Sequence, residues 1–320
     1  MSNPELTTEM RETKALIELE LSKFVCGLEL KLGPQVKYAL LSGGKRLRPM
    51  IVLLAAQSVG GDRKKAVPLA LAFEIAHNSS LIQDDMIDKD AFRRGKLAFY
   101  KNWSANTAIL TGDLLIAYTV YLSSSYEKNI LKVFSESIIE LCEGEYMDLM
   151  LTLDSTEKEY FQMINSKSAS LFQAAASCGA LVGGASREDY ECLSNFGKNF
   201  GIAYQLKDDL RDLKPGEGQV SEDLKKGRVT LPLMHLYGMS NSFEKKAIDE
   251  AFHKAAMKDG IESDAAVKGI IKKLEETDSI VYVEEKLDEY LQLTIASIAP
   301  LKDSSYKLAL LQMSKILKRN

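Results

Sequence analysis

The chain has 320 residues, of which 46% are hydrophobic and 27% are charged. This composition can bury a full-sized core, and it excludes a disordered chain. The 41 Lys and Arg residues against 45 Asp and Glu residues give a formal net charge of −4, which argues against a basic nucleic-acid-binding protein. Any anionic ligand must therefore be held by locally placed bases and not by the overall field of the protein.

The cysteines and the apolar runs bear on the cellular compartment in which the protein is expected. The four cysteines lie far apart and form no C-x-x-C pair, which disfavours a disulfide scaffold or a zinc site. The N-terminus has no basic stretch followed by an apolar run, and the longest apolar stretch, Thr107–Leu122, is interrupted by Asp113. A membrane helix needs about 18 or more apolar residues. We therefore expect a cytoplasmic protein with reduced thiols and no transmembrane segment.

Prolines and glycines divide the chain into long helical stretches. In chain order the predicted breaks are Pro34, Gly43–Gly44, Pro49, Gly60–Gly61, Pro215–Gly218, Pro232 and Pro300. Between them apolar residues recur at intervals of three and four, as from Leu71 to Ile87, which predicts helices. No two β-like runs are joined by a tight turn, and no G-x-G-x-x-G or P-loop occurs.

This pattern predicts an all-α protein of about ten or more helices. No linker rich in Gly, Ser or Pro separates two halves, so residues 1–320 are predicted to form a single domain. The more charged stretch from Asn241 onward is interpreted as outer helices of that domain.

Two acidic segments with the pattern D-D-x-x-D stand in apolar helical surroundings. They comprise Asp84, Asp85 and Asp88, and Asp208, Asp209 and Asp212. Residues at i and i+4 share a helix face, where like charges repel. A sequence that does this twice is better explained by a bound cation than by a solvated acidic face. Oxygen ligands alone favour Mg²⁺, which usually bridges one or two carboxylates to phosphates.

Basic residues accompany these acidic motifs. The segment Gly43–Pro49 carries Lys45, Arg46 and Arg48 behind a glycine pair and before a helix start, which suits a diphosphate. Arg93 and Arg94 follow the first acidic motif, and His77 precedes it by two helical turns. Taken alone, the basic pairs are typical of solvated surface and the histidine of a core residue.

Taken together, these residues resemble the trans-isoprenyl diphosphate synthase family, the head-to-tail prenyltransferases. The similarity runs in order from about residue 40 to residue 235. It comprises GGKRLRP at 43–49, EIAHNSSLIQDDMID at 74–88, RRG at 93–95, Thr111–Asp113, Gly144–Glu145 with Asp148, Lys167–Ser168, Tyr204–Gln205, DDLRD at 208–212 and DLKKGRVTLP at 223–232.

The resemblance implies the isoprenoid synthase fold, a helical bundle around a deep central cavity, usually in a homodimer. It also implies about three Mg²⁺ ions that join both acidic motifs to the diphosphate of an allylic substrate. The allylic diphosphate ionises and releases diphosphate, and the double bond of isopentenyl diphosphate attacks the allylic cation. A proton is then lost, and the chain has grown by one five-carbon unit. Metal ions and bases stabilise the leaving diphosphate, so no nucleophilic side chain is needed.

Site residues follow from the resemblance by position. The implied metal ligands are Asp84, Asp88, Asp208 and Asp212, with Asp85 and Asp209 as catalytic support. Lys45, Arg48, His77 and Arg94 match the isopentenyl diphosphate site. Arg93, Lys167, Ser168 and Gln205 match the allylic diphosphate site, where Lys167 is also counted as catalytic and Arg228 as a further phosphate ligand.

Three positions depart from the family pattern. Lys167–Ser168 stands where the family has Lys-Thr, Gly227–Arg228 where it has Gly-Lys, and Gly218–Gln219 where it often has Gly-Lys. The serine keeps the hydroxyl, and an arginine can still hold phosphate as a fork. Gln219 cannot do so, which predicts a weaker grip on the allylic diphosphate.

The residues four and five positions before the first aspartate set the product length in this family, and short-chain members often place an aromatic residue there. Here they are Ser80 and Ser79. A serine leaves room for a longer tail, so we expect a product of C20 to C30, with C25 as the central value.

Other functions stay open at this point. A terpene cyclase shares the first acidic motif, but its second motif commonly resembles N-x-x-x-S-x-x-x-E, where this chain has DDLRD. A non-catalytic subunit of a heteromeric synthase would lose aspartates, and none is lost. A di-iron bundle carries paired Glu-x-x-His, which occurs here at Glu74–His77 and Glu250–His253.

Overall fold

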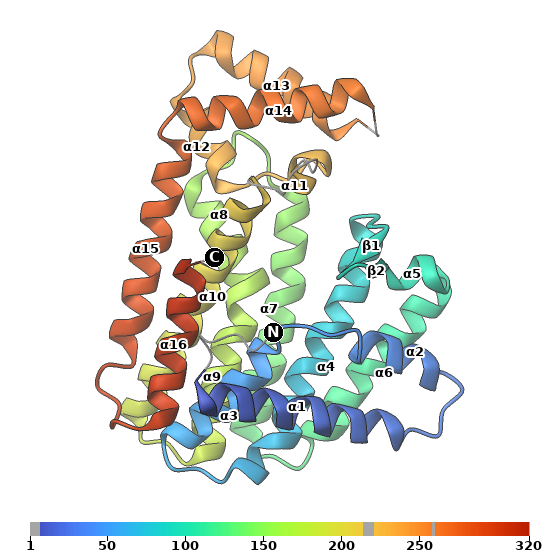
Figure 1. The fold of residues 1–320 in the computed structure, drawn as a ribbon, viewed down its shortest axis with the longest axis vertical. Helices are drawn as coiled ribbons and strands as arrows, with labels where there is room; N and C mark the ends of the chain where they lie inside the picture. The colour runs from blue at the N-terminus through green and yellow to red at the C-terminus, as the bar shows by residue number, and fades with distance from the viewer. Residues whose placement is uncertain (1–6, 214–220, 258–259, 320) are drawn as a thin grey trace. The chain divides into compact units, whose positions relative to one another are not determined.

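A computed structural model describes residues 7–213, 221–257 and 260–319 of the chain (Figure 1). Over these residues the only strands are β1 (Phe92–Arg93) and β2 (Lys96–Leu97), which form one antiparallel hairpin. Helices make up nearly all of the remaining regular structure. The prediction of an all-α fold is confirmed.

The contacts within the chain divide it into two compact units. Unit 1 comprises Met1–Ile138, Leu171–Gly197 and Ser297–Ile316, and unit 2 comprises Ile139–Ser170, Lys198–Ala296 and Leu317–Asn320. Two long helices, α7 (Lys128–Met150) and α10 (Arg187–Asp212), contribute residues to both units. A single domain around a deep central cavity stays a prediction.

Unit 1 is built mainly from the N-terminal helices. They are α1 (Thr8–Cys26), α2 (Gly33–Leu40), α3 (Leu47–Ser58), α4 (Arg63–Ile87), α5 (Phe99–Asn102) and α6 (Ala105–Ser123), with most of α9 (Ser170–Gly183) and α16 (Ser305–Arg319).

Unit 2 is built mainly from the C-terminal half of the chain. Its elements are α8 (Glu157–Ile164), the π-helix η1 (Asn165–Ala169), α11 (Glu222–Lys225), α12 (Leu231–Met239), α13 (Ser242–Ala256), α14 (Ile261–Glu276) and α15 (Ser279–Ser297).

The predicted helix breaks agree with the structure at most positions. Pro34 and Pro232 lie in the first turns of α2 and α12, where a proline costs no helical hydrogen bond. Pro49 was predicted to precede a helix, but α3 already begins at Leu47. It lies in the first turn of that helix, where a missing N–H is again tolerated. The break at 215–218 lies outside the described residues.

Helix α4 carries the first acidic motif and is the longest helix of unit 1. The Asp62 side chain caps its start by accepting a hydrogen bond from the Lys64 amide. Its apolar side chains, among them Leu69, Phe73 and Ile75, are buried, and it packs against α3 and α6. This packing stabilises α4 up to its last turn, where the aspartates lie.

Helix α6 is apolar on more than one side. Thr111, Leu115 and Thr119 are buried. Of its most apolar stretch of 18 residues, however, only 28% is buried inside the protein. Over the described residues it is the one helix long and apolar enough to cross a membrane by length and composition alone. Core helices pass the same test, and the exposed Asp113 interrupts this one.

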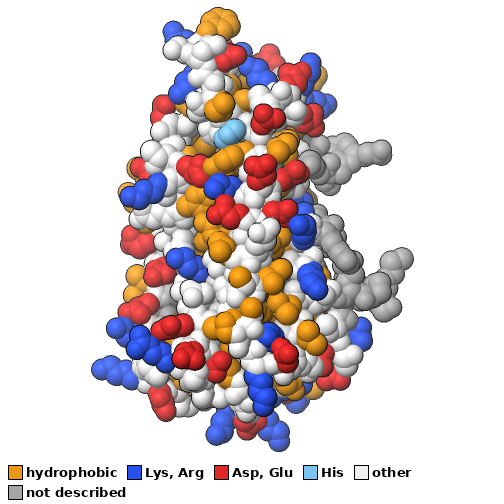
Figure 2. Space-filling view, turned by 90° about the vertical axis from the view of Figure 1, so that its left-hand side faces the viewer, with side chains coloured by type: hydrophobic (Ala, Val, Ile, Leu, Met, Phe, Trp, Pro, Cys, Tyr) orange, Lys and Arg blue, Asp and Glu red, His pale blue; other side chains and the backbone are white. Residues whose placement is uncertain are grey.

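Surface charges of both signs are interspersed. On the face drawn in Figure 2, acidic and basic side chains alternate with apolar ones, and neither sign dominates. This distribution agrees with the near balance of charges in the sequence. All four cysteines lie among the described residues, and none of them forms a disulfide bond.

Candidate active site

The first acidic motif lies in the last turn of α4, where Asp88 is the C-cap. Asp84 and Asp88 are half-buried, whereas Asp85 is only 2% exposed. The carbonyl end of a helix carries negative partial charge, so carboxylates are unfavourable there unless a cation compensates them. The location of Asp84 and Asp88 therefore supports a cation site.

Arg93 binds the middle aspartate of this motif. Its Nε donates to the Asp85 carboxylate in a close ion pair, and its Nη2 lies 3.4 Å from Asp90 Oδ2. Asp85 thus turns toward the β-hairpin. Arg93, which the sequence predicts to bind the allylic diphosphate, therefore forms an ion pair with Asp85, a predicted catalytic residue of the same unit.

The glycine pair that opens the first basic segment makes room for Arg94. The Arg94 guanidinium donates to the Gly43 carbonyl, and a Cβ added at Gly44 would lie 3.1 Å from its Nη1. Gly44 has φ +147, which also disfavours a side chain. The pair therefore joins two basic segments that are fifty residues apart in the sequence.

His77 lies within reach of these arginines. Its ring is half-buried, and burial, together with the positive charges of Arg48, Arg94 and Arg93, holds its pKa well below the ordinary value. His77 is therefore neutral near pH 7. Unit 1 thus brings together three residues predicted for isopentenyl diphosphate: His77, Arg48 and Arg94.

The other predicted bases differ in exposure. Lys45 is exposed, and Arg48 is half-buried. The Arg48 guanidinium lies 4.2 Å from the centre of the Phe172 ring, a cation–π contact that fixes its direction. Arg93 and Arg94 also line a small pocket of unit 1, together with Ser42 and Asn78.

Arg46, the third base of the segment, has a structural role. It is 2% exposed and adopts a left-handed backbone with φ 56. Its guanidinium donates to Glu74 at 2.5 Å, to Glu18 at 2.9 Å and to the Leu40 carbonyl at 2.8 Å. The sequence grouped Arg46 with the diphosphate bases, whereas the fold turns it into the core.

The same contacts argue against a di-iron centre. The Glu74 carboxylate is engaged by Arg46 and by Asn78 Nδ2 at 3.0 Å. The His253 ring bonds the carbonyl of Asp249 in its own helix at 2.8 Å. One residue of each Glu-x-x-His pair, Glu74 or His253, is therefore engaged by other groups of the protein.

Replacing Arg46 with methionine is expected to lower the free energy of unfolding by about 3–5 kcal/mol, because Glu74 would remain buried without its cation. Urea unfolding followed by circular dichroism measures the change. Lys132→Met is the control, since Lys132 forms an exposed pair with Glu136 and its loss should change stability little. Equal stability of Arg46→Met and wild type would contradict the structural role.

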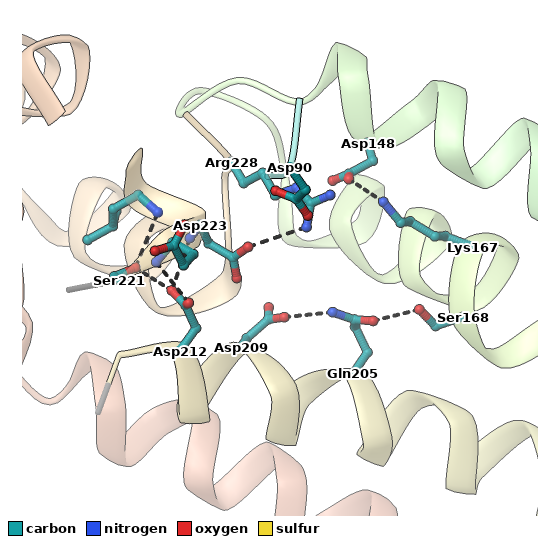
Figure 3. A network of polar contacts seen from close by, with 12 residues as sticks. Asp90, Asp148, Lys167, Ser168, Gln205, Asp209, Asp212, Ser221, Asp223 and Arg228 are labelled. Atoms are coloured by element: carbon teal, nitrogen blue, oxygen red, sulfur yellow. Dashed lines mark hydrogen bonds and ion pairs between the residues drawn. The ribbon is translucent and has the colours of Figure 1, made fainter. Parts of the chain in front are cut away.

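The second acidic motif ends α10 in unit 2 (Figure 3). Asp208 is exposed, Asp209 is 3% exposed and Asp212 is half-buried. Asp209 accepts hydrogen bonds from the Tyr160 hydroxyl at 2.6 Å and from Gln205 Nε2 at 2.8 Å. Burial and the charge of Asp223 raise the pKa of Asp209 to about 7.

Asp212 caps the short helix α11. Its carboxylate accepts from the Glu222 amide at 3.0 Å, from the Asp223 amide at 3.2 Å and from the Ser221 hydroxyl. A carboxylate has about four acceptor positions, so most of its capacity is used within the protein. Of the aspartates in this motif, Asp208 presents the most accessible carboxylate.

Lys167 lies in η1 between two acidic side chains. Its Nζ is 2.6 Å from Asp148 Oδ2 and 2.9 Å from Glu145 Oε2. Burial lowers the pKa of Lys167, but Asp148 and Glu145 outweigh burial and raise it, so the ammonium stays charged. A Cβ at Gly144 would lie 2.1 Å from the Lys167 amide nitrogen. Only glycine permits α7 to approach η1 so closely.

Ser168 and Gln205 contact each other. Ser168 Oγ donates to Gln205 Oε1 at 2.6 Å. Arg228, the remaining predicted phosphate ligand, has Nη1 at 3.4 Å from Asp223 Oδ1. Unit 2 therefore holds Ser168 and Gln205 in one hydrogen-bonded group. Gln219 lies outside the described residues.

Ser79 and Ser80 are both buried. Ser79 Oγ donates to the Gly112 carbonyl of α6 at 3.1 Å, and Ser80 Oγ donates to the His77 carbonyl of its own helix at 2.9 Å. Ser79 therefore lies where α4 packs on α6, and both serine hydroxyls are satisfied by backbone carbonyls.

Two residues of the candidate site, Tyr160 and Asp223, were not predicted from the sequence. Tyr160 belongs to no recognised motif, and a single buried aromatic residue carries no signal of its own. Asp223 stands in the DLKKGRVTLP segment, but its neighbourhood of Asp212 and Arg228 depends on the fold. The only sequence signal for Asp223 was that it is acidic and follows the second acidic motif by eleven residues.

The carboxylates fit a cation with few protein ligands. Over the described residues no three His, Cys, Asp or Glu side chains are grouped to hold a metal ion. Mg²⁺ usually takes one or two carboxylates and completes its shell with water and phosphate. The half-buried Asp84 and Asp88 and the exposed Asp208 suit that mode of binding.

Comparisons with known proteins agree on the family. The polyprenyl synthetase family model matches residues 31–270. A geranylgeranyl diphosphate synthase of Methanosarcina mazei is 36% identical over 87% of this chain and 86% of its own length. An octaprenyl diphosphate synthase of Escherichia coli is 30% identical over 90% of each chain. The crystal structure of a geranylgeranyl pyrophosphate synthetase of Pyrococcus horikoshii has a TM-score of 0.87 and 31% identity, and covers 97% of both chains.

Proposed function

The chain belongs to the polyprenyl synthetase family, and from this premise we propose that it condenses isopentenyl diphosphate with an allylic diphosphate to make an all-trans polyprenyl diphosphate. The observation that carries the proposal is the repeated acidic motif, with accessible carboxylates at the end of α4 and at the end of α10. Each motif shares its unit with cationic side chains suited to phosphate.

Mg²⁺ is proposed to bind Asp84 and Asp88 in unit 1 and Asp208 in unit 2. Asp212, in the same motif as Asp208, is a further proposed ligand, although its carboxylate also accepts hydrogen bonds from the start of α11. When bound, Mg²⁺ would neutralise charge on the departing diphosphate. Asp85 and Asp209 act from buried positions by fixing Arg93 and Gln205. The reaction needs no nucleophilic side chain, because the attacking group is the double bond of isopentenyl diphosphate.

Isopentenyl diphosphate is proposed to bind the bases of unit 1: Lys45, Arg48, Arg94 and His77. Arg48 and Arg94 are held by the Phe172 ring and the Gly43 carbonyl, so each offers a guanidinium of fixed direction. The neutral His77 can donate a hydrogen bond to the diphosphate without adding charge.

The allylic diphosphate is proposed to bind Lys167, Ser168, Gln205 and Arg228 of unit 2. The family resemblance assigns Arg93 of unit 1 to the same substrate. Lys167 is charged and placed by Asp148 and Glu145. Ionisation places new negative charge on the diphosphate, where these donors stabilise it without reorganising. An apolar cavity would keep water from the allylic cation.

The experiment that tests this function is a product assay. Purified protein is incubated with isopentenyl diphosphate, Mg²⁺ and an allylic primer of 5, 10, 15 or 20 carbons, and the products are identified by mass spectrometry. We expect primers extended by whole five-carbon units. Primers that stay unextended under all conditions would refute the proposal.

Product length is proposed to be C20 to C30, with C25 as the central value, because serines and not aromatic residues stand at positions 79 and 80. Ser80→Phe or Ser79→Phe is expected to shorten the product by one or more five-carbon units, since a phenylalanine ring is much larger than the buried serine that it replaces. The product distribution gives the measurement, and Ser80→Ala is the control that should leave it unchanged. An unaltered product distribution in both phenylalanine variants would show that other residues limit the product length.

The protein is proposed to be a homodimer, and a cytoplasmic location stays a prediction. Helix α6 exposes Ile109, Leu110, Val120 and Tyr121, an apolar face that suits a second copy. Light scattering at micromolar concentration should give twice the chain mass of 35.5 kDa. Val120→Glu should lower that mass, whereas Phe243→Glu on α13 should not. A wild-type mass of one chain would contradict the dimer.

A further inference from the structure

Tyr160 is a buried tyrosine that no acidic or basic motif includes. It lies on α8 with no exposed surface, and its hydroxyl donates to Asp209 Oδ2 at 2.6 Å. A hydrogen bond to a carboxylate in a buried setting is stronger than one between neutral groups. This bond joins α8 to the middle aspartate of the second acidic motif.

The bond is the first link of a chain of polar contacts in unit 2, of which Figure 3 shows the part from Asp209 through Gln205 to Ser168. Asp209 Oδ1 accepts from Gln205 Nε2 at 2.8 Å, and Gln205 Oε1 accepts from Ser168 Oγ at 2.6 Å. The Gln205 amide has one donor end and one acceptor end in use, which fixes its orientation. The chain ends at Ser168, which directly follows Lys167 in η1.

We propose that Tyr160 is a positioning residue for binding of the allylic diphosphate. By holding Asp209 in one rotamer, its hydroxyl fixes Gln205 and, through Gln205, the Ser168 hydroxyl beside Lys167. The inference rests on the proposed function and deepens it, because it names a residue outside the motifs that controls affinity for one of the two substrates.

The contacts around α8 separate this role from a general structural one. The helix is already fixed at its start by the capping box of Thr156 and Glu159 and by the Tyr282 hydroxyl, which donates to Glu157 at 2.6 Å. Tyr160→Phe keeps the buried ring and its edge-on contact with Phe161. The substitution therefore removes only the bond to Asp209.

Tyr282→Phe is a matched control, because it also removes a tyrosine–carboxylate bond to α8 but lies outside the chain of contacts. Binding of a non-ionising thio analogue of a C15 allylic diphosphate is measured by calorimetry with Mg²⁺. Tyr160→Phe should weaken binding about tenfold, as expected for the loss of one buried hydrogen bond. Its KM for isopentenyl diphosphate should stay at the wild-type value, and Tyr282→Phe should change neither quantity.

A double-mutant cycle tests the linkage itself. If Tyr160 acts through Gln205 on Ser168, the losses in Tyr160→Phe and Ser168→Ala should be less than additive. Additive losses, or equal weakening for both substrates, would overturn the proposal. Should Tyr160→Phe fail to fold by circular dichroism, Asp209→Ala removes the acceptor of both hydrogen bonds and must show the same selective loss of analogue binding.

Failure of the proposed function and failure of the positioning role of Tyr160 would give different results. If wild-type protein neither binds the analogue nor extends a primer, the proposed function and this inference both fall. If wild-type protein does both and Tyr160→Phe behaves like Tyr282→Phe, only the positioning role is refuted.

Discussion

Replacing Asp84 with alanine is expected to lower kcat by about two to three orders of magnitude, and Asp208→Ala should do the same. Each substitution removes an accessible carboxylate that we propose as a Mg²⁺ ligand, so charge on the departing diphosphate would no longer be neutralised. Steady-state kinetics at saturating Mg²⁺ gives the effect, and circular dichroism should show unchanged helicity.

Asp154→Ala is the matched control for both variants, because Asp154 is an exposed aspartate in the loop before α8. It should retain wild-type kcat. A kcat within a few-fold of wild type in Asp84→Ala or Asp208→Ala would exclude that aspartate as a catalytic ligand.

The second large effect is expected for Lys167→Ala. This variant should raise KM for the allylic substrate about 10- to 100-fold, the range for losing a charged hydrogen-bond donor, while KM for isopentenyl diphosphate changes little. Removal of Lys167 also leaves Asp148 and Glu145 facing the bound diphosphate, which adds repulsion. Initial rates with one substrate varied and the other saturating separate the two constants.

The opposite selectivity is expected in unit 1. Arg94→Ala and His77→Ala should raise KM for isopentenyl diphosphate and leave KM for the allylic substrate unchanged.

Lys286→Ala is the control for Lys167→Ala, since Lys286 forms an ion pair with Glu289 at 3.1 Å on α15. The division into two diphosphate sites would be wrong if all three site variants affected both substrates equally.

Local sequence patterns predicted the helices and both acidic motifs. Spacings of three and four identify α4 and α10 because their buried faces repeat with the helix period. The same spacing indicated that Asp84 and Asp88 share a face. The error at Pro49 arose because a proline in the first turn of a helix looks the same in sequence as one that precedes it.

Contacts between distant segments could not be predicted from local patterns. Arg46 appears in the sequence as one more base of a diphosphate segment, yet its partner Glu74 lies 28 residues away. Tyr160 and Asp209 are 49 residues apart. Likewise, Asp212 fits the acidic repeat, but the hydrogen bond that it accepts from the Glu222 amide joins residues ten positions apart.

The central claim is that this chain joins two diphosphate substrates in a metal-dependent reaction. An omission series tests it most directly, with labelled isopentenyl diphosphate, a C15 allylic primer and Mg²⁺ supplied together or with one left out. The account predicts label in a longer prenyl diphosphate only in the complete mixture. Conversion of the primer alone into a cyclic hydrocarbon, or extension that persists after chelation of all divalent metal, would contradict it.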